Sequence, residues 1–272
     1  MTEPTQTAPE AAAVVVPMTA KEDYFADLAF GELATDLESL LKAGVHFGHL
    51  KSRRHPQMED YIFTTRKNIN IIDLEQTKER LEAACAFLAD VVKSGKPLLF
   101  VGMSKQSLPL VRSLANRLGE SYVIDRWLGG TLTNFKQIHG RAKYLNDSLE
   151  QRESGAFKKY TKFEQAKKTE EIERLEKKVG GIRTLADLPG AIVIADVKEA
   201  GLAVQEAAKL KIPLVGIVDS NTNPDSIDYP IPGNDDAVSS LKILLGALGK
   251  AVLEAKTEAS TKATTPEVSS AK

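Results

Sequence analysis

The alternation of short apolar runs with longer helical patterns is the feature that most constrains this chain. The run "PLLFVG" (97–102) contains no charged or hydrogen-bonding side chain, and "GAIVIAD" (190–196) and "IPLVGIVD" (212–219) are apolar up to a terminal aspartate. Unbroken apolar runs of this length are typical of strands that are buried on both faces of a parallel sheet. Since segments with helical spacing alternate with these runs, the sequence predicts an α/β fold with a parallel sheet flanked by helices.

The remaining elements follow from the same pattern. Further strands are expected at 68–74, 121–125 and 227–231. A short helix is expected from about Asp36 to Gly44, and Asp235 or Asp236 suits the amino end of the last helix because a carboxylate there meets the helix dipole. The other long helices are expected at 75–95, 105–119, 198–211 and 234–255.

Residues 135–183 interrupt the alternation. Apolar residues recur there at steps of three and four on both sides of the turn-prone segment "RESGAF". Two such arms predict an inserted antiparallel, coiled-coil-like helical hairpin. Basic side chains outnumber acidic ones in it by about five, which suits either the solvated face of a coiled coil or an arm lying along nucleic acid.

The two ends of the chain are rich in Thr, Pro, Ala and Glu without a sustained period, and we expect them to be disordered. Residues 1–41 hold eight acidic side chains and one lysine. The expected division is an acidic arm at 1–36, an α/β domain at 37–134 and 184–254, the hairpin at 135–183, and a tail at 255–272. Because no signal-peptide pattern and no run of membrane-spanning length is present, a cytoplasmic location is expected.

The formal net charge of -1 conceals a basic segment at 42–67, which has six Lys and Arg and three His against two acidic residues. Within it, "HLKSRRHPQM" is interrupted by Pro56 and is predicted to be a loop. Arginine and lysine on loops suit an irregular phosphate backbone, and arginine and histidine can stack on unpaired bases. This segment is therefore the candidate contact for a polyanion.

Candidates for catalysis are few. The segment "GMSKQS" lacks the glycine spacing of a nucleotide-binding loop, although helix amides near Ser104, with Lys105 beside them, could hold a phosphate. Asp125, Asp196 and Asp219 each end a strand, where a carboxylate serves as a metal ligand, as an acid or base, or as the cap of the next turn. The pair His46 and His49 is a weak metal pattern without a third ligand. The lone Cys85 excludes an internal disulfide and is expected to be an inert core thiol.

The stretch "RWLGGTLTNF" (126–135) joins the predicted sheet to the hairpin. Trp127, the only tryptophan, is expected to be packed rather than stacked on a ligand, while Gly129 and Gly130 permit close approach of the backbone. Thr131 fits the N-cap of the first hairpin helix, whose opening amides would then point outward. The stretch is predicted to be a structural joint that also faces phosphate, and not a catalytic loop.

Several long motifs, in this order, resemble the S-two family, the second protein of the bacterial small ribosomal subunit. The resemblance covers about residues 37–254. The motifs are "AGVHFGH", "YIFTTRKNINIIDL", "LFVGMSKQ", "RWLGGTLTNF", "VGGIRTLADLPGAIVIAD" and "KIPLVGIVDSNTNPDSIDYPIPGNDDA".

This resemblance implies a flavodoxin-like sheet with a helical hairpin, no catalytic activity and no cofactor. It implies binding to small-subunit ribosomal RNA on the solvent side, where the head meets the body, and contacts with neighbouring ribosomal proteins, including an S-one type protein where one exists. Neither a membrane nor a small-molecule substrate is expected. The residues expected to face RNA are Lys51, Arg53, Arg54, His55, Arg66, Lys67, Lys105, Arg126, Lys136, Arg141 and Lys143.

The chain departs from the family pattern in two places. The acidic arm is longer than is usual, and the segment Asp196–Glu199 lacks the proline that commonly follows the strand. Family members with a metal near the residues matching His46, His49 and the strand-end aspartates are known, but no metal site is predicted here. Two alternatives remain open: a flavodoxin-like enzyme that acts on a small phosphorylated ligand, and a purely protein-binding role for the arm and hairpin.

Overall fold

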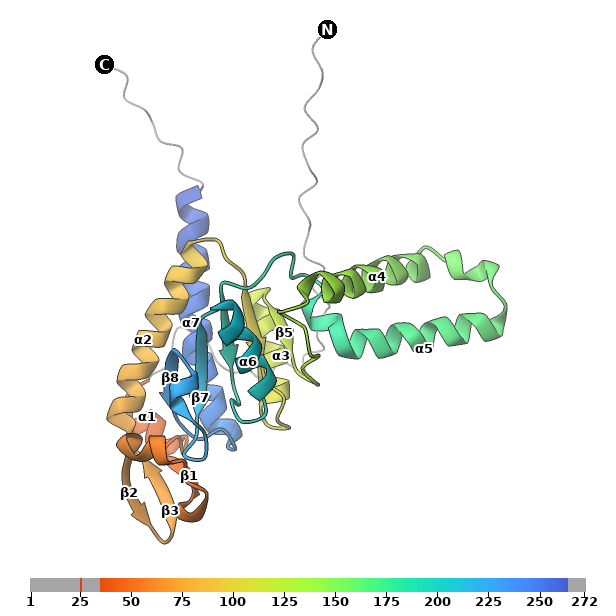
Figure 1. Cartoon of the computed structure of the whole chain (residues 1–272). Helices are drawn as coiled ribbons and strands as arrows, with labels where there is room; N and C mark the ends of the chain where they lie inside the picture. Colours follow the sequence, from red (N-terminus) through yellow and green to blue (C-terminus); the bar gives the residue numbers. More distant parts are fainter. Residues whose placement is uncertain (1–24, 26–34, 264–272) are drawn as a thin grey trace, which may run out of the picture.

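The computed structural model describes residue 25 and residues 35–263 (Figure 1). Its main sheet has five parallel strands in the order β5-β4-β6-β7-β8. The predicted parallel α/β fold is thereby confirmed. The strands are β4 (Leu98–Val101), β5 (Ser121–Val123), β6 (Ala191–Ile194), β7 (Leu214–Val218) and β8 (Tyr229–Pro232).

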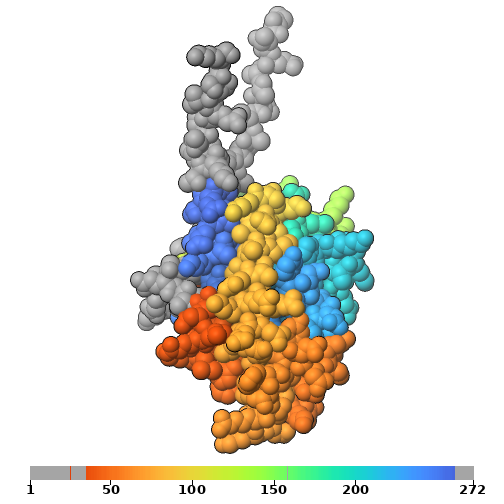
Figure 2. All heavy atoms as spheres, turned by 90° about the vertical axis from the view of Figure 1, so that its left-hand side faces the viewer, coloured from red at the N-terminus to blue at the C-terminus, as the bar shows by residue number. Residues whose placement is uncertain are grey.

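Helices cover both faces of this sheet. Leu98 and Phe100 of β4 belong to one buried cluster together with α2 (Leu74–Lys93), α3 (Ser107–Leu118) and α7 (Val238–Ala263). Leu99 and Val101 belong to a second buried cluster with α6 (Gly201–Leu210) and the base of the hairpin. Successive side chains of a strand point to opposite faces, so the apolar run of β4 supplies both cores. Helices α2 and α7 lie side by side in both views (Figures 1 and 2).

A second, antiparallel sheet of three strands lies below the parallel sheet in Figure 1. It consists of β1 (Phe47–Leu50), β2 (Ile62–Arg66) and β3 (Ile69–Ile72), in the order β1-β3-β2. The strand predicted at 68–74 belongs here and not to the parallel sheet. The short helices α1 (Leu37–Lys42), η2 (Lys51–Arg53) and η3 (Pro56–Tyr61) adjoin this sheet along the chain.

The inserted segment folds into two helices, α4 (Phe135–Glu153) and α5 (Lys162–Val179), which project from the sheet as an antiparallel pair (Figure 1). Ile138, Ala142 and Leu145 of α4 and Ile172 of α5 are buried between them. Thr161 forms a capping box with Glu164 at the start of α5. Short 3-10 helices flank α5: η4 (Ala156–Lys159) before it and η5 (Gly180–Ile182) after it. A coiled-coil geometry for the pair stays a prediction.

Both ends of the last helix differ from the sequence-based expectations. Helix α7 begins at Val238, and the turn before it is held by Asn234, whose Oδ1 accepts hydrogen bonds from the amides of Asp236 and Ala237. The tail was expected from residue 255, but α7 continues to Ala263 because Lys256 pairs with Glu120 and Glu258 with Lys93. Residues 1–24, 26–34 and 264–272, on which the predictions of disorder fall, lie outside the described residues, whereas Phe25 is fully buried in the core of α2, α3 and α7.

Candidate nucleic-acid interface

The first group of predicted RNA-facing cations lies on the small antiparallel sheet and beside it. Lys51 and Arg53 are exposed on η2, directly after β1. Arg66 and Lys67 are exposed at the tight turn between β2 and β3, where Lys67 and Asn68 both have positive φ. The turn joins two paired strands and η2 directly follows β1, so these charges are held beside the small sheet, where they can contact a phosphate backbone.

Arg54 and His55 belong to the same predicted set, but each has a partner within the protein. The guanidinium of Arg54 is 3.1 Å from Oε1 of Glu59. The Nδ1 of His55 accepts a hydrogen bond from the amide of Gln57, and the His55 amide donates to the carbonyl of Ser220. These two side chains are only partly exposed, so the structure gives them a clear role in shaping the loop.

The second group of cations lies at the base of the hairpin. Arg126 precedes the buried Trp127, and Lys136, Arg141 and Lys143 are exposed on α4. Lys105 is exposed between β4 and α3, at the carboxyl edge of the parallel sheet. The eleven predicted residues therefore do not form one continuous patch, because the small sheet and the hairpin extend in different directions (Figure 1).

The stretch 126–135 is fixed by a carboxylate that the sequence did not point to. Glu206 of α6 accepts hydrogen bonds through Oε1 from Trp127 Nε1 (3.1 Å) and from the amide of Gly130 (2.7 Å). Its Oε2 accepts from the amides of Leu132 (3.0 Å) and Thr133 (3.1 Å) and from the Thr133 hydroxyl (3.2 Å). Trp127 is 3% exposed, which confirms that it is packed.

Two expectations about this stretch are wrong. Thr131 is not the N-cap of α4, since the helix begins at Phe135 and the Thr131 hydroxyl donates to the carbonyl of Leu128. The amides of Gly130, Leu132 and Thr133 do not point outward to phosphate, because Glu206 already takes their hydrogen bonds. Burial by itself would raise the pKa of Glu206, but these amides and Trp127 hold its pKa below the ordinary value.

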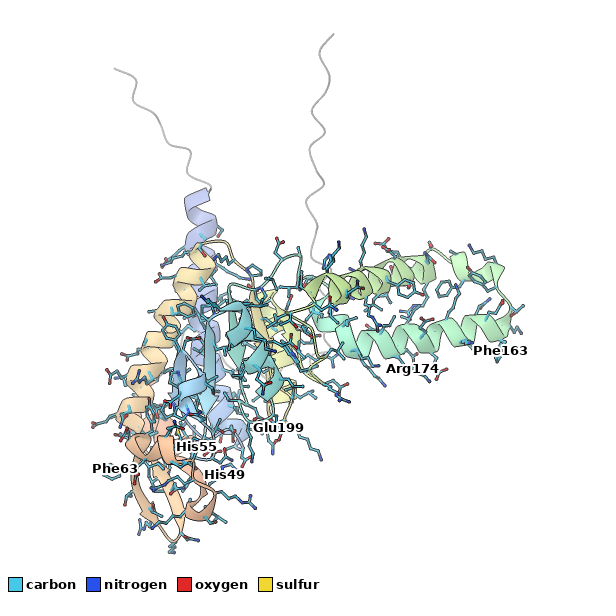
Figure 3. The ribbon with its side chains drawn as sticks, viewed as in Figure 1. His49, His55, Phe63, Phe163, Arg174 and Glu199 are labelled. Atoms are coloured by element: carbon cyan, nitrogen blue, oxygen red, sulfur yellow. The ribbon has the colours of Figure 1, made fainter. Side chains whose placement is uncertain are left out.

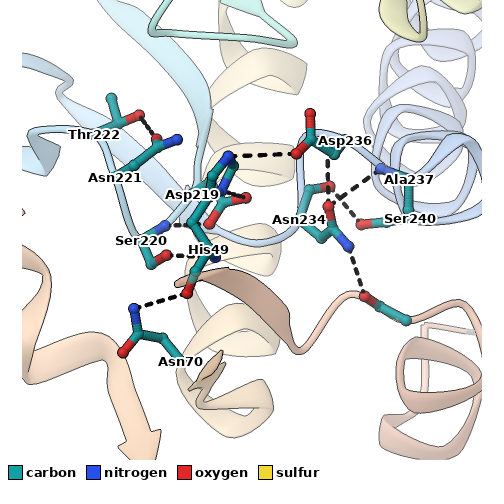
Figure 4. Close-up of polar contacts among 11 residues, drawn as sticks. His49, Asn70, Asp219, Ser220, Asn221, Thr222, Asn234, Asp236, Ala237 and Ser240 are labelled. Atoms are coloured by element: carbon teal, nitrogen blue, oxygen red, sulfur yellow. Dashed lines mark hydrogen bonds and ion pairs between the residues drawn. The ribbon is translucent and has the colours of Figure 1, made fainter. Parts of the chain in front are cut away.

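An acidic cluster with one histidine lies at the carboxyl edge of the parallel sheet (Figure 4). The Nδ1 of His49 is 3.0 Å from Oδ2 of the buried Asp219, and its Nε2 is 3.4 Å from Oδ2 of the exposed Asp236. The His49 amide donates to the Ser220 hydroxyl, and Asn70 Nδ2 donates to the His49 carbonyl. His46, the other member of the H-x-x-H pair, lies outside the cluster and packs against the Phe47 ring.

Two groups of the cluster have raised pKa values. The hydrogen bond to Asp219 raises the pKa of His49, and burial next to Asp219 and Asp196 raises the pKa of Asp235 to about 8. His49, Asp219 and Asp235 offer ligand atoms that all lie within 4.8 Å of one another. One imidazole and two carboxylates suit a divalent cation in donor chemistry; the prediction that the chain binds no metal stays a prediction.

The other candidates for chemistry have structural partners or lie apart. Asp196 accepts a hydrogen bond from the amide of Glu199, so it caps the turn after β6. The Ser107 amide at the start of α3 donates to the Ser104 hydroxyl, which occupies the place predicted for a phosphate. Asp125 is exposed and Cys85 is half-buried, with burial raising the Cys85 pKa to about 11.

Exposed apolar side chains form another feature of the small sheet. Phe63 is 76% exposed, and Phe47 and Leu50 of β1 are also exposed (Figure 3 shows Phe63). Phe47 lies opposite Ile71 and Leu50 opposite Ile69 in the pairing of β1 with β3, which gives this end of the molecule an apolar character. Among the described residues, no helix is both long and apolar enough to cross a membrane.

The fold and these surfaces define a class of protein: an α/β scaffold that presents cations on loops and on a projecting helix pair. Residues 40–255 match the family model described as Ribosomal protein S2. The chain is similar to "Small ribosomal subunit protein uS2" of Roseiflexus sp. (strain RS-1), with 46% identity over 80% of this chain and 83% of that protein. It is similar as well to "Small ribosomal subunit protein uS2c" of Cyanophora paradoxa, with 45% identity over 80% of this chain and 94% of that protein.

The chain therefore belongs to the ribosomal protein S2 family. Members of this family are structural ribosomal proteins and not enzymes. The alternative of a flavodoxin-like enzyme acting on a phosphorylated ligand is accordingly abandoned.

Proposed function

We propose that the chain is a structural constituent of the small ribosomal subunit, binds small-subunit ribosomal RNA where head meets body on the solvent side, and supports translation in the cytoplasm. Its membership of the ribosomal protein S2 family supports the first part. The observation that carries the RNA contact is the exposure of nine of the eleven predicted residues, four of them beside the small sheet, four at the hairpin and its base, and Lys105 at the carboxyl edge of the parallel sheet. A protein with two such basic groups can join two separate pieces of RNA.

The protein binds RNA by holding its exposed cations in fixed positions, and it catalyses no reaction. The exposed cations of η2, of the β2–β3 turn and of α4 neutralise phosphates, and the release of condensed counterions supplies much of the affinity. Phosphate contacts position a protein on nucleic acid without reading its sequence. The specificity of the complex then comes from the fixed geometry between the small sheet and the hairpin.

Neighbouring ribosomal proteins are the second kind of partner, with an S-one type protein among them. The exposed Phe47, Leu50 and Phe63 support a protein contact at the small sheet, because aromatic side chains are enriched at the centres of protein interfaces. The Phe63→Ser variant should then retain RNA binding and lose affinity for the neighbouring protein. Unchanged affinity in a pull-down from dissociated subunits would remove this contact from the proposal.

The RNA site is tested by directed cleavage. Because the pKa of Cys85 is raised to about 11, an exposed cysteine placed at Thr64 on β2 or at Gly140 on α4 can be labelled selectively with an iron chelate. After assembly into subunits, label at Thr64 and label at Gly140 should cleave different segments of ribosomal RNA around the head–body junction. Labelled protein that fails to sediment with the subunit, or cleavage confined to distant RNA, would overturn the proposal.

A further inference from the structure

We propose that Glu206 is the positioning residue that fixes the direction in which the helical hairpin projects from the sheet. Its five hydrogen bonds all end in the stretch between β5 and α4, residues 124–134, that carries the chain into the hairpin. No other feature of the described residues ties that stretch to α6 through so many contacts. The inference concerns geometry; only its consequence for RNA rests on the proposed function.

The loop has the geometry of an anion-binding site, and the carboxylate of Glu206 is the anion that it binds. Gly130 has φ +91, and its carbonyl accepts a hydrogen bond from the amide of Asn134. This turn directs the amides of Gly130, Leu132 and Thr133 toward a single point. Converging amides of this kind form an anion-binding nest, and the carboxylate of Glu206, which is 8% exposed, fills the nest.

The position of Glu206 links the hairpin to the parallel sheet. Helix α6 follows β6 and packs on the same face as the base of the hairpin. Thr133 is separated from the first residue of α4, Phe135, by one residue only. A tether this close to the helix leaves α4 little freedom to swing about its amino end.

The returning arm of the hairpin, α5 with η5, is attached to the sheet at a second place. Gly181 in η5 lies so close to β5 that a Cβ built on it would be 2.2 Å from the carbonyl oxygen of Tyr122. His139 Nδ1 is 3.1 Å from the carbonyl oxygen of Leu185. The base of the hairpin is therefore held at two points, of which the Glu206 nest fixes α4 and the packing of Gly181 fixes α5.

The consequence for the proposed function is that Glu206 sets the spacing between Arg126 and the cations of α4. Arg126 precedes the nest and Lys136 follows it, and both are exposed. Preorganised groups bind with less loss of freedom than mobile ones. A hairpin that swings should weaken the contact of the whole protein with ribosomal RNA even though no cation has been removed.

The test compares Glu206→Gln with Glu206→Asp and with the control Glu79→Gln, an exposed glutamate on α2. In a Cys85→Ala background, spin labels are placed at Phe163, which is 79% exposed near the tip of the hairpin, and at Glu199 on the body (Figure 3). Double electron–electron resonance then measures the distribution of distances between the labels. Emission from Trp127, the only tryptophan, reports on the nest itself.

The distance distribution should be narrow in the parent protein and in Glu79→Gln and clearly broader in Glu206→Gln, with red-shifted Trp127 emission. Glu206→Asp keeps the charge but has a shorter side chain, so the width of its distance distribution should lie between those of the parent protein and Glu206→Gln. If Glu206→Gln does not fold, Glu206→Asp alone serves as the test. Folded variants with an unchanged distribution would overturn the inference. A broader distribution with full RNA affinity would instead contradict the proposed RNA contact of the hairpin, since we expect affinity to fall by roughly tenfold.

Discussion

The imidazole of His49 on β1 lies 3.0 Å from the buried carboxylate of Asp219 at the end of β7, although 170 residues separate the two in the chain. This contact joins the small antiparallel sheet to the parallel sheet. The neighbouring Asp235 is buried as well and shares the site. The junction between the two sheets is therefore a cluster of titratable groups.

Stability should fall as the pH rises through the range of this cluster. The pKa of folded Asp235, about 8, lies above that of an unfolded aspartate, so the folded state holds a proton that the unfolded state has lost. The contribution is greatest near pH 4 and decreases as the pH approaches 8. The raised pKa of His49 acts in the same direction, because its stabilisation is complete below the ordinary histidine value and is lost above the folded value.

Urea unfolding at pH 5.5 and pH 8.5, in buffer with a chelator, measures this effect. The variant Asp235→Asn should lose less of its free energy of unfolding between the two pH values than the parent protein, by on the order of 1–2 kcal/mol. Asp225→Asn, at an exposed position, is the control and should behave as the parent does. Equal pH dependence of all three proteins would count against a protonated Asp235.

Reversal of the exposed cations on η2 should weaken RNA binding. In Lys51→Glu/Arg53→Glu, the slope of log affinity against log salt should become shallower by about two, because each lost phosphate contact removes about one released ion. Arg54 is a poorer choice for this test, since it pairs with Glu59. Filter binding over a salt series makes the measurement.

Lys96→Glu/Lys209→Glu provides a charge-matched control for that experiment. Both lysines are exposed near the amino ends of β4 and β7, at the opposite edge of the sheet from η2. If this control lost as much affinity and slope as the η2 variant, binding would depend on overall charge and not on the proposed site.

The close approach of Gly181 to β5 should make that position intolerant of a side chain. Gly181→Ala places a Cβ 2.2 Å from a main-chain oxygen of Tyr122, which cannot move without disturbing the sheet edge. A loss of about 2–3 kcal/mol in the free energy of unfolding is expected. Gly140→Ala on α4, where a Cβ meets nothing within 4 Å, should be neutral or stabilising. Thermal or urea melts of the two variants would contradict this account if Gly181→Ala were the milder change.

Phe25 should contribute strongly to stability despite lying in the segment predicted to be an arm. It is fully buried, and its carbonyl accepts a hydrogen bond from Arg117 Nη1 at 2.7 Å. Phe25→Ala should cost about 3–5 kcal/mol in the free energy of unfolding, whereas Phe163→Ala, at an exposed position, should cost less than about 0.5 kcal/mol. Similar urea midpoints for both variants would show that Phe25 is not part of the core.

Removal of residues 1–24, which leaves Phe25 in place, should not reduce RNA affinity. The segment carries acidic side chains that have no reason to approach phosphate. Filter binding of the shortened protein compares it directly with the full chain, and weaker binding would assign the arm a share in the RNA contact.

Local patterns predicted the parallel sheet and its helices well. The apolar run of β4 and the helical stripe of α2 can be read from the sequence alone, and Gly95 follows the end of α2 as expected. Asp73, which falls within the strand predicted at 68–74, is instead the N-cap of α2. Strands β1 and β2 were missed because their residues are mostly polar or exposed and depend on pairing with β3 and on contacts with Asp219 and Ser220.

The candidate site was predicted only in part for a similar reason. The sequence indicated which cations are available, but not that Arg54 forms an ion pair with Glu59. It indicated that 126–135 is a joint, but not that the carboxylate which fills it comes from Glu206, more than 70 residues away. A lone glutamate among the small apolar residues of α6 was the available clue.

The dependence of β1 on the last fifth of the chain has a consequence for biosynthesis. His49 and His55 form hydrogen bonds with Ser220, and Val45 forms one with Asn234. The basic loop between His49 and His55 therefore cannot pack in its final place until these distant residues have left the exit tunnel. A nascent chain would thus finish the hairpin well before its first cations are in place. The two basic groups therefore become available one after the other during synthesis, the group on the hairpin first and the group on η2 last.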